Sequence, residues 1–205
     1  MLSPLATLLW TWAAIYGYVG LYYTMLHRRR PSQRVYLAFG LLCFGLAVWS
    51  AGSAVHADAG TFAEGRLAIR VQQIAGFALV AFFADFAWSL AGRRRRTLPL
   101  VAYGWCGFGI GLNVAGLLVE PGPPPAYDVH VVELGRRQPD PQFTDLGRVV
   151  AAGVIAVAAA AVWTIARAMR GTSERRWLGG AAGFAVAAGV HDLFAQMLRV
   201  RSVHL

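Results

Sequence analysis

Long apolar runs separated by short polar stretches repeat along the 205-residue chain. An α-helix needs roughly 20 apolar residues to cross the hydrocarbon core of a bilayer, and helices satisfy their own backbone hydrogen bonds there. The pattern therefore predicts one all-α domain over residues 1–205, a polytopic membrane bundle of six transmembrane helices. The expected spans cover about 4–26, 35–55, 67–90, 99–119, 149–168 and 177–198.

The segments outside these runs are too short for a second domain. The connection 120–145 carries "EPGPPP", and its consecutive prolines favour an extended strap. No Lys or Arg precedes the first apolar run, which is also longer than the apolar region of a signal peptide. We therefore expect residues 4–26 to remain as a span. The composition agrees, since 57% of residues are hydrophobic and the mean hydropathy is +0.50.

Arginine is distributed asymmetrically between alternate loops. All 19 basic residues are Arg, and the net charge is +9. The stretches "HRRRPSQR", "GRRRR" and "RAMRGTSERR" contain most of them and only one acid, Glu174. The positive-inside rule then places these loops in the cytoplasm and the N-terminus and loop 120–145 outside. Arginines grouped at the ends of spans also argue against a nucleic-acid-binding face.

Small residues suggest where helices approach one another. Gly107 and Gly111, and likewise Gly179 and Gly183, are four residues apart. Such spacing allows close helix packing in lipid, although a glycine-rich composition would produce it as well. Cys43 and Cys106 fall inside expected spans and imply no disulfide framework.

Polar side chains inside the spans are the candidates for function, because they are costly in a bilayer. His191 lies fifteen residues beyond Arg176, so it is roughly 22 Å from the cytoplasmic boundary. Other polar residues on four helices reach the same outer half. An outward-opening ligand pocket would use such groups, whereas residues at helix ends could simply be hydrated at the headgroups. The candidate ligand-binding residues are His191, Asp192, Gln196, Asn113, His56, Gln72 and Gln73.

Asp85 is a separate case, because it lies near the cytoplasmic end of the third span, eight residues before Arg93. A buried acid needs a partner or a proton. Arg167 on the fifth span reaches a similar level, so an intramembrane ion pair between Asp85 and Arg167 is expected if these helices touch. A proton relay is the alternative, but no chain of further acids accompanies Asp85.

Motifs of enzymes and cofactor sites are missing from the sequence. It contains no H-E-x-x-H, G-x-S-x-G, Walker loop or C-x-x-C. His56 and His191 could ligate a haem, but no C-x-x-C-H motif supports this. We expect no catalytic activity, no cofactor and no metal.

Two stretches of the sequence share features with a known family. In "YLAFGLLCFGLAVWSAGSAVHADAGTFAEGRLAIRVQQIAGFALVAFFADFAWSLAGRRRR", a Trp late in one helix precedes a short loop, and the next helix ends in arginines. In "GTSERRWLGGAAGFAVAAGVHDLF", a charged "ERR" step leads into a glycine-rich span. The first stretch resembles the second and third helices of the N-terminal seven-helix sensor region of bacterial histidine kinases and related cyclases, and the second is similar to that region's junction into its sixth helix. The resemblance implies a module that passes a signal to a cytoplasmic output domain. The sequence departs from the family because it stops at Leu205, without a seventh helix or an output domain.

These observations lead to two hypotheses for function. The first is a sensory module of the bacterial inner (cytoplasmic) membrane that binds a small or lipophilic ligand in its outer half. The second is an accessory structural subunit of a larger respiratory or photosynthetic membrane complex, suggested by a chain that ends after six spans. A transporter is disfavoured because broken helices and paired charges are not evident. The expected partners are membrane lipids, the ligand, and a second copy of the chain or a larger complex.

The charge asymmetry yields a test of topology. A cysteine introduced at Ala126 should react with a membrane-impermeant thiol reagent in intact cells, because loop 120–145 is expected outside. Labelling that occurs only after lysis would refute this orientation.

Overall fold

A computed structural model describes residues 3–92, 97–119, 129–131, 136–138 and 143–168. The chain is helical in this part, apart from one short β-hairpin. The helices are α1 (Pro4–Arg29), α2 (Arg34–Ala57), α3 (Phe62–Leu90), α4 (Thr97–Val114) and α5 (Asp145–Ala168). The hairpin pairs β1 (Val129–Val131) with β2 (Arg136–Gln138) in antiparallel register.

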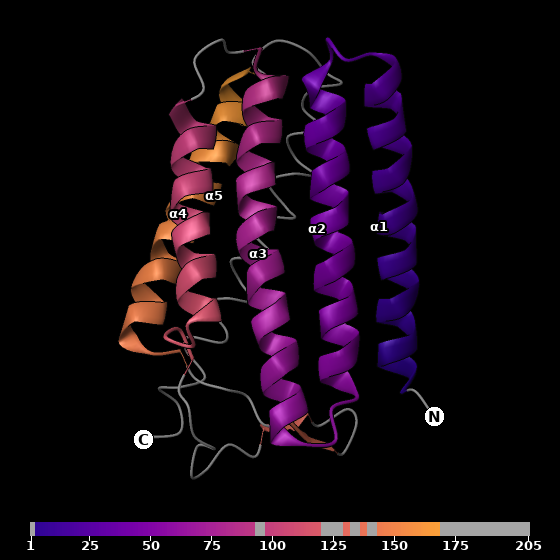
Figure 1. Cartoon of the computed structure of the whole chain (residues 1–205), viewed down its shortest axis with the longest axis vertical. Coiled ribbons are helices and arrows are strands. Elements are labelled where there is room, and N and C mark those ends of the chain that lie inside the picture. The colour runs from indigo at the N-terminus through magenta and orange to yellow at the C-terminus, as the bar shows by residue number, and fades with distance from the viewer. Residues whose placement is uncertain (1–2, 93–96, 120–128, 132–135, 139–142, 169–205) are drawn as a thin grey trace.

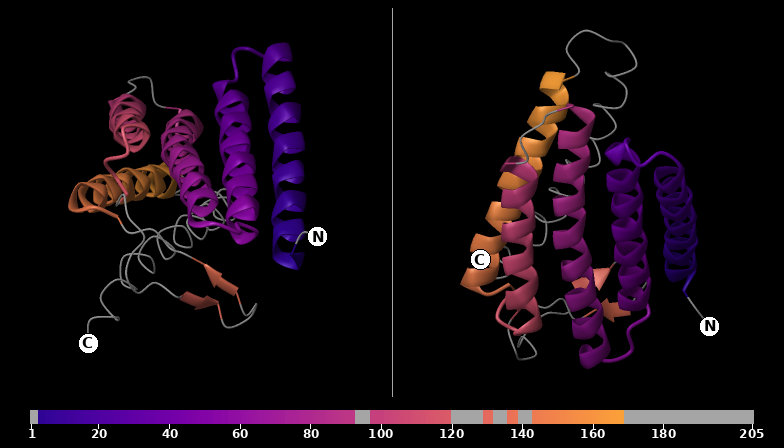
Figure 2. Two further views of the ribbon diagram at one scale, coloured as in Figure 1. Left: turned by 60° about the horizontal axis from the view of Figure 1, so that its bottom comes forward. Right: turned by 45° about the horizontal axis from the view of Figure 1, so that its top comes forward.

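The helices form an up-and-down bundle with α3 at its centre. Figure 1 shows α1, α2 and α3 side by side, and α4 and α5 lie beyond α3. Helix α3 contacts α2, α4 and α5, whereas α1 packs mainly on α2. In Figure 2, α5 is inclined to the other helices. Because successive helices are antiparallel, the last turns of α1, α3 and α5 lie at one end, which we call the arginine end; the opposite end is the outer end.

Four of the described helices indicate a membrane protein. Helices α2, α4, α5 and residues 63–90 of α3 are long and apolar enough to cross a bilayer. Helix α1 has 26 residues and is long enough, but it is not among these four helices. Its many Trp and Tyr side chains are less apolar than aliphatic ones. The expected count of six spans is not confirmed, because α1 is not one of the four and residues 177–198 lie outside the described part of the chain.

Local capping explains two helix boundaries that differ from those expected. Helix α3 begins before residue 67 because Thr61 and Glu64 form a capping box, in which the Glu64 amide donates to Thr61 Oγ1 at 3.3 Å. Helix α4 ends before residue 119 because Gly116 adopts a φ of 77°, a conformation that favours glycine. The chain then continues to Val119, which forms a β-bridge with Phe143.

The hairpin corrects one detail of the expected outer connection. Strands β1 and β2 pair through Val129↔Gln138 and Val131↔Arg136. They lie near the end of the bundle at which α3 begins (Figure 1). The extended strap expected between residues 120 and 145 therefore includes a short antiparallel pair, because extended backbone gains hydrogen bonds by pairing with another strand.

Small residues determine how closely α1 and α2 approach. The buried residues of α1 are Ala6, Ala13 and Gly20, seven residues apart, which is the spacing of a coiled-coil seam. A Cβ atom built on Gly40 would lie 2.7 Å from Thr24 Oγ1 and 3.1 Å from the Gly20 carbonyl oxygen. No side chain larger than hydrogen fits between these backbones.

Elsewhere, glycines accommodate large side chains from the neighbouring helix. Gly76 of α3 faces Trp49 of α2, and Gly109 of α4 faces Phe77 of α3. The glycine face expected on the fourth span does not contact α3. A Cβ atom added to Gly107 or Gly111 would have no neighbour within 4 Å among the described residues, because α4 turns Gly109 toward α3 instead.

The crossing of α1 and α2 yields a test of packing. Gly40→Ala should destabilise the purified chain by about 1–3 kcal/mol, because the new methyl group overpacks the contact with Thr24 and Gly20. Gly17→Ala is the matched control on α1, since nothing lies within 4 Å of its Cβ position. Thermal unfolding in detergent measures both variants, and equal melting temperatures would contradict the close contact.

Candidate functional site

Polar side chains meet between α2, α3 and α4 toward the outer end of the bundle. We call this group the outer layer; it consists of Ser53, Arg70, Gln72, Gln73 and Asn113. Gln72 Nε2 donates a hydrogen bond to Ser53 Oγ at 2.6 Å. Ser53 Oγ in turn donates to the Trp49 carbonyl at 3.0 Å. Gly52 permits this contact, because a Cβ there would lie 2.8 Å from Gln72 Cγ. Gln72 is therefore part of a satisfied link between α2 and α3.

Asn113 forms the corresponding link between α3 and α4. Its side chain is 1% exposed, and Nδ2 donates to the Arg70 carbonyl at 2.9 Å. The Arg70 side chain reaches toward the turn after α4, where its Nη2 would lie 2.7 Å from a Cβ on Gly116. Arg70 Nε is buried and has no hydrogen-bond partner among the residues that the structure describes. The outer layer thus contains a cationic side chain with an unsatisfied donor.

Gln73 contributes an unsatisfied acceptor. Its Oε1 is buried and likewise has no hydrogen-bond partner in the described part of the chain. Gln73 follows Arg70 by three residues, so both project from neighbouring directions on α3. His56 lies at the outer end of α2, and its Nδ1 would be 3.7 Å from a Cβ on Gly65.

The structure brings together some of the expected ligand-binding residues. Gln72, Gln73 and Asn113 lie in the outer layer, and His56 lies at the outer end of α2 beside it. His191, Asp192 and Gln196 lie outside the described residues. The sequence-based prediction missed Arg70 and Ser53, although an Arg within the apolar stretch "AIRVQQIAG" was a visible signal.

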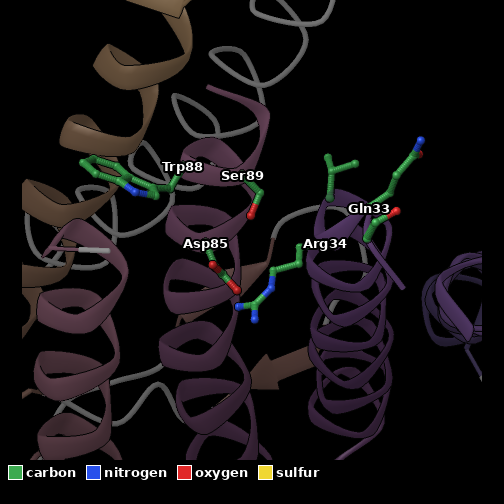
Figure 3. A pocket seen from close by; sticks show the side chains of 7 residues that line it. Gln33, Arg34, Asp85, Trp88 and Ser89 are labelled. Atoms are coloured by element: carbon green, nitrogen blue, oxygen red, sulfur yellow. The ribbon is translucent and has the colours of Figure 1, made fainter. Parts of the chain in front are cut away.

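A second polar region lies at the arginine end, between the start of α2 and the end of α3. Figure 3 shows the cavity there, with Asp85 and Arg34 pointing toward one another. Its volume is about 260 Å³. The Asp85 carboxylate is partly buried and accepts a hydrogen bond from the Tyr103 hydroxyl of α4 at 3.3 Å. The cavity is lined by Ser32, Gln33, Arg34, Val35, Asp85, Trp88 and Ser89.

The expected ion pair between Asp85 and Arg167 is not formed in the described part of the chain. Helices α3 and α5 do touch, but Arg167 is exposed on the last turn of α5. An exposed guanidinium remains hydrated, which favours a position away from the helix interface. Asp85 instead accepts a hydrogen bond from Tyr103, because antiparallel packing brings the first half of α4 beside the second half of α3.

Cysteine and metal-ligating residues do not gather at either site. No group of three His, Cys, Asp or Glu residues that could hold a metal ion occurs among the described residues. Cys43 and Cys106 are free and buried on different helices.

Comparisons with known proteins found no matching family model, curated protein or solved structure. The resemblance to a histidine-kinase sensor region therefore stays a prediction.

The link between α3 and α4 can be tested through Asn113. Asn113→Leu keeps a similar volume but removes the donor to the Arg70 carbonyl, and it should destabilise the chain by about 1 kcal/mol. Val114→Leu is the control on the same turn, because the Val114 side chain is 69% exposed. Thermal unfolding in detergent compares the two variants. If Asn113→Leu is as stable as the control, the hydrogen bond does not contribute to stability.

Proposed function

We propose that the chain is a sensory module of the bacterial inner membrane that binds a small or lipophilic ligand in its outer half and has no catalytic activity. The observation that carries this proposal is the incomplete hydrogen bonding of the outer layer. Among the described residues, Arg70 Nε and Gln73 Oε1 are buried without partners, whereas Gln72 and Asn113 beside them are satisfied. Buried polar groups are normally paired, so a missing partner supports a ligand.

The charge of Arg70 suggests the chemistry of this ligand. The Arg70 side chain is partly buried and forms no ion pair among the described residues. Its Nε is a buried donor without a partner in that part of the chain, and an unpaired buried donor costs free energy. A carboxylate or carbonyl oxygen on an apolar body would accept from the guanidinium. The Gln73 amide would then contact a donor on the same ligand, or the apolar body would displace water from it.

The orientation with the N-terminus outside and the count of six spans belong to this proposal. Arg28 in the last turn of α1, Arg34 at the start of α2 and Arg167 in the last turn of α5 all lie at the arginine end, which supports the orientation. Signalling to a cytoplasmic output domain would follow if the resemblance to histidine-kinase sensor regions reflects ancestry.

A second candidate function is an accessory subunit of a larger respiratory or photosynthetic membrane complex. The outward face of α4 favours it, because Gly104, Gly107 and Gly111 are exposed and have open space at their Cβ positions. Such a face allows another helix to approach closely in lipid. The native mass of the assembly purified from membranes separates the two functions, since a subunit would copurify with other proteins at fixed stoichiometry.

Ligand binding is tested with a lipophilic acid and its matched alcohol. Decanoate should raise the melting temperature of the purified full chain by several degrees, and decanol should raise it less, because only the acid supplies a charged acceptor for Arg70. Arg70→Gln should abolish the difference between the two compounds.

Arg148→Gln is the matched control for Arg70→Gln. Arg148 also lies toward the outer end of the bundle, but it is exposed and paired with Asp145 at 3.1 Å. The variant should retain the preference for decanoate. Equal effects of acid and alcohol on the wild-type chain, or a preference that survives Arg70→Gln, would contradict the proposed site.

A further inference from the structure

Two residues of opposite charge line the cavity at the arginine end. Asp85 of α3 and Arg34 of α2 point toward one another there (Figure 3). No ion pair joins them in the described structure, and the only hydrogen bond to the Asp85 carboxylate there comes from Tyr103. The volume of about 260 Å³ is several times the roughly 30 Å³ that one water occupies in the liquid, so the cavity has room for a small charged group.

The cationic side of the cavity is suited to a phosphate. Arg34 is exposed and begins α2, and no side chain caps this helix at Gln33. Guanidinium groups bind phosphate oxygens through paired N–H donors, and the partial positive charge of a helix start adds to this attraction. The Ser32 and Ser89 side chains provide hydroxyl groups on the wall of the cavity.

The carboxylate of Asp85 makes the cavity unfavourable for a ligand that carries only negative charge. Asp85 would repel a free phosphate bound at Arg34. A cationic group placed beside Asp85 removes this repulsion, and an ammonium with N–H donors also hydrogen-bonds the carboxylate. The arrangement therefore favours a ligand that carries both charges.

The cavity lies close to the ends of α2 and α3, where we expect the headgroups of a bilayer that these helices span. Asp85 precedes Leu90, the last residue of α3, by five residues, which corresponds to about 8 Å along the helix. The headgroup region on each side of the hydrocarbon core is about 5–8 Å thick. Arg34 stands at the first position of α2, so the cavity spans this region.

We propose that this cavity binds the headgroup of a phospholipid that carries a phosphate and a primary ammonium, as in phosphatidylethanolamine. Arg34 binds the phosphate and Asp85 binds the ammonium. The acyl chains extend into the bilayer along the apolar surface of the helices. The site lies at the opposite end of the bundle from the outer layer, so it does not depend on the proposed function.

General attraction to the membrane surface would give a different lipid preference. Arg28, Arg29 and Arg30 are exposed at the same end and attract every anionic lipid. Charge alone therefore favours phosphatidylglycerol. A preference for phosphatidylethanolamine over phosphatidylcholine requires recognition of the N–H donors, because the trimethylammonium of phosphatidylcholine has none.

The test measures lipid binding to the detergent-solubilised full chain by native mass spectrometry. Phosphatidylethanolamine, phosphatidylcholine and phosphatidylglycerol with identical acyl chains are titrated separately. We expect phosphatidylethanolamine to bind at least about fivefold more tightly than phosphatidylcholine, because only its ammonium donates hydrogen bonds to Asp85. Asp85→Asn should reduce this ratio to about one, and Asp85→Glu should retain it. Arg34→Gln should weaken binding of all three lipids.

Two control variants remove a charge outside the cavity. Asp145→Asn removes an exposed acid near the outer end, and Arg28→Gln removes an exposed arginine of α1 at the arginine end. Both should retain the wild-type ratio. Circular dichroism verifies that each variant is folded, and the wild-type ratio alone tests the proposal if Asp85→Asn does not fold.

Several results would overturn the proposal. Equal binding of phosphatidylethanolamine and phosphatidylcholine to the wild-type chain would show that the ammonium is not recognised. A ratio unchanged by Asp85→Asn, with lower stability of both Asp85→Asn and Arg34→Gln, would show that these residues pair directly. Soluble phosphoethanolamine that binds as tightly as the lipid would identify a free small molecule as the ligand.

Discussion

Contact between glycines and the neighbouring helix is the constraint on which the bundle depends. Helices in lipid gain little from the hydrophobic effect, so close van der Waals packing must hold them together. At Gly20 and Gly40, two backbones meet without an intervening side chain. At Gly76 and Gly109, a glycine provides the space for an aromatic ring from the adjacent helix. These contacts determine the rotation of each helix about its axis.

The rotation of the helices in turn divides the polar side chains into two groups. Gln72 and Asn113 face neighbouring helices and form hydrogen bonds across the interfaces. Arg70 and Gln73 project from α3 as well, but within the described part of the chain they retain buried atoms without partners. Satisfied groups strengthen the bundle, whereas unsatisfied groups in an apolar environment lose free energy unless a ligand or water pairs with them. This difference supports binding in the outer layer.

The two candidate sites use charge in different ways. The outer layer presents the Arg70 guanidinium, which has no counter-charge among the described residues. The cavity at the arginine end presents Arg34 and Asp85 together, close to the start of α2 and the end of α3. A single partly buried cation suits an acceptor, whereas a cation and an anion that line one cavity suit the zwitterion that we propose. The position of α3 explains both sites, because its two ends contribute to one site each.

The sequence by itself predicted all five described helices, and each end of a helix lies within five residues of its expected position. Apolar length and arginine clusters are local properties, so they survive whatever the helices contact. The capping box at Thr61 and the turn at Gly116 are also local features, which shift the start of α3 and the end of α4 from the limits of the apolar runs. Tertiary structure alone decided that Asp85 bonds to Tyr103 instead of Arg167, and that Gly109, not Gly107, meets α3. Such pairings depend on the rotation and neighbours of each helix, and a pattern with many apolar and small residues is compatible with several rotations.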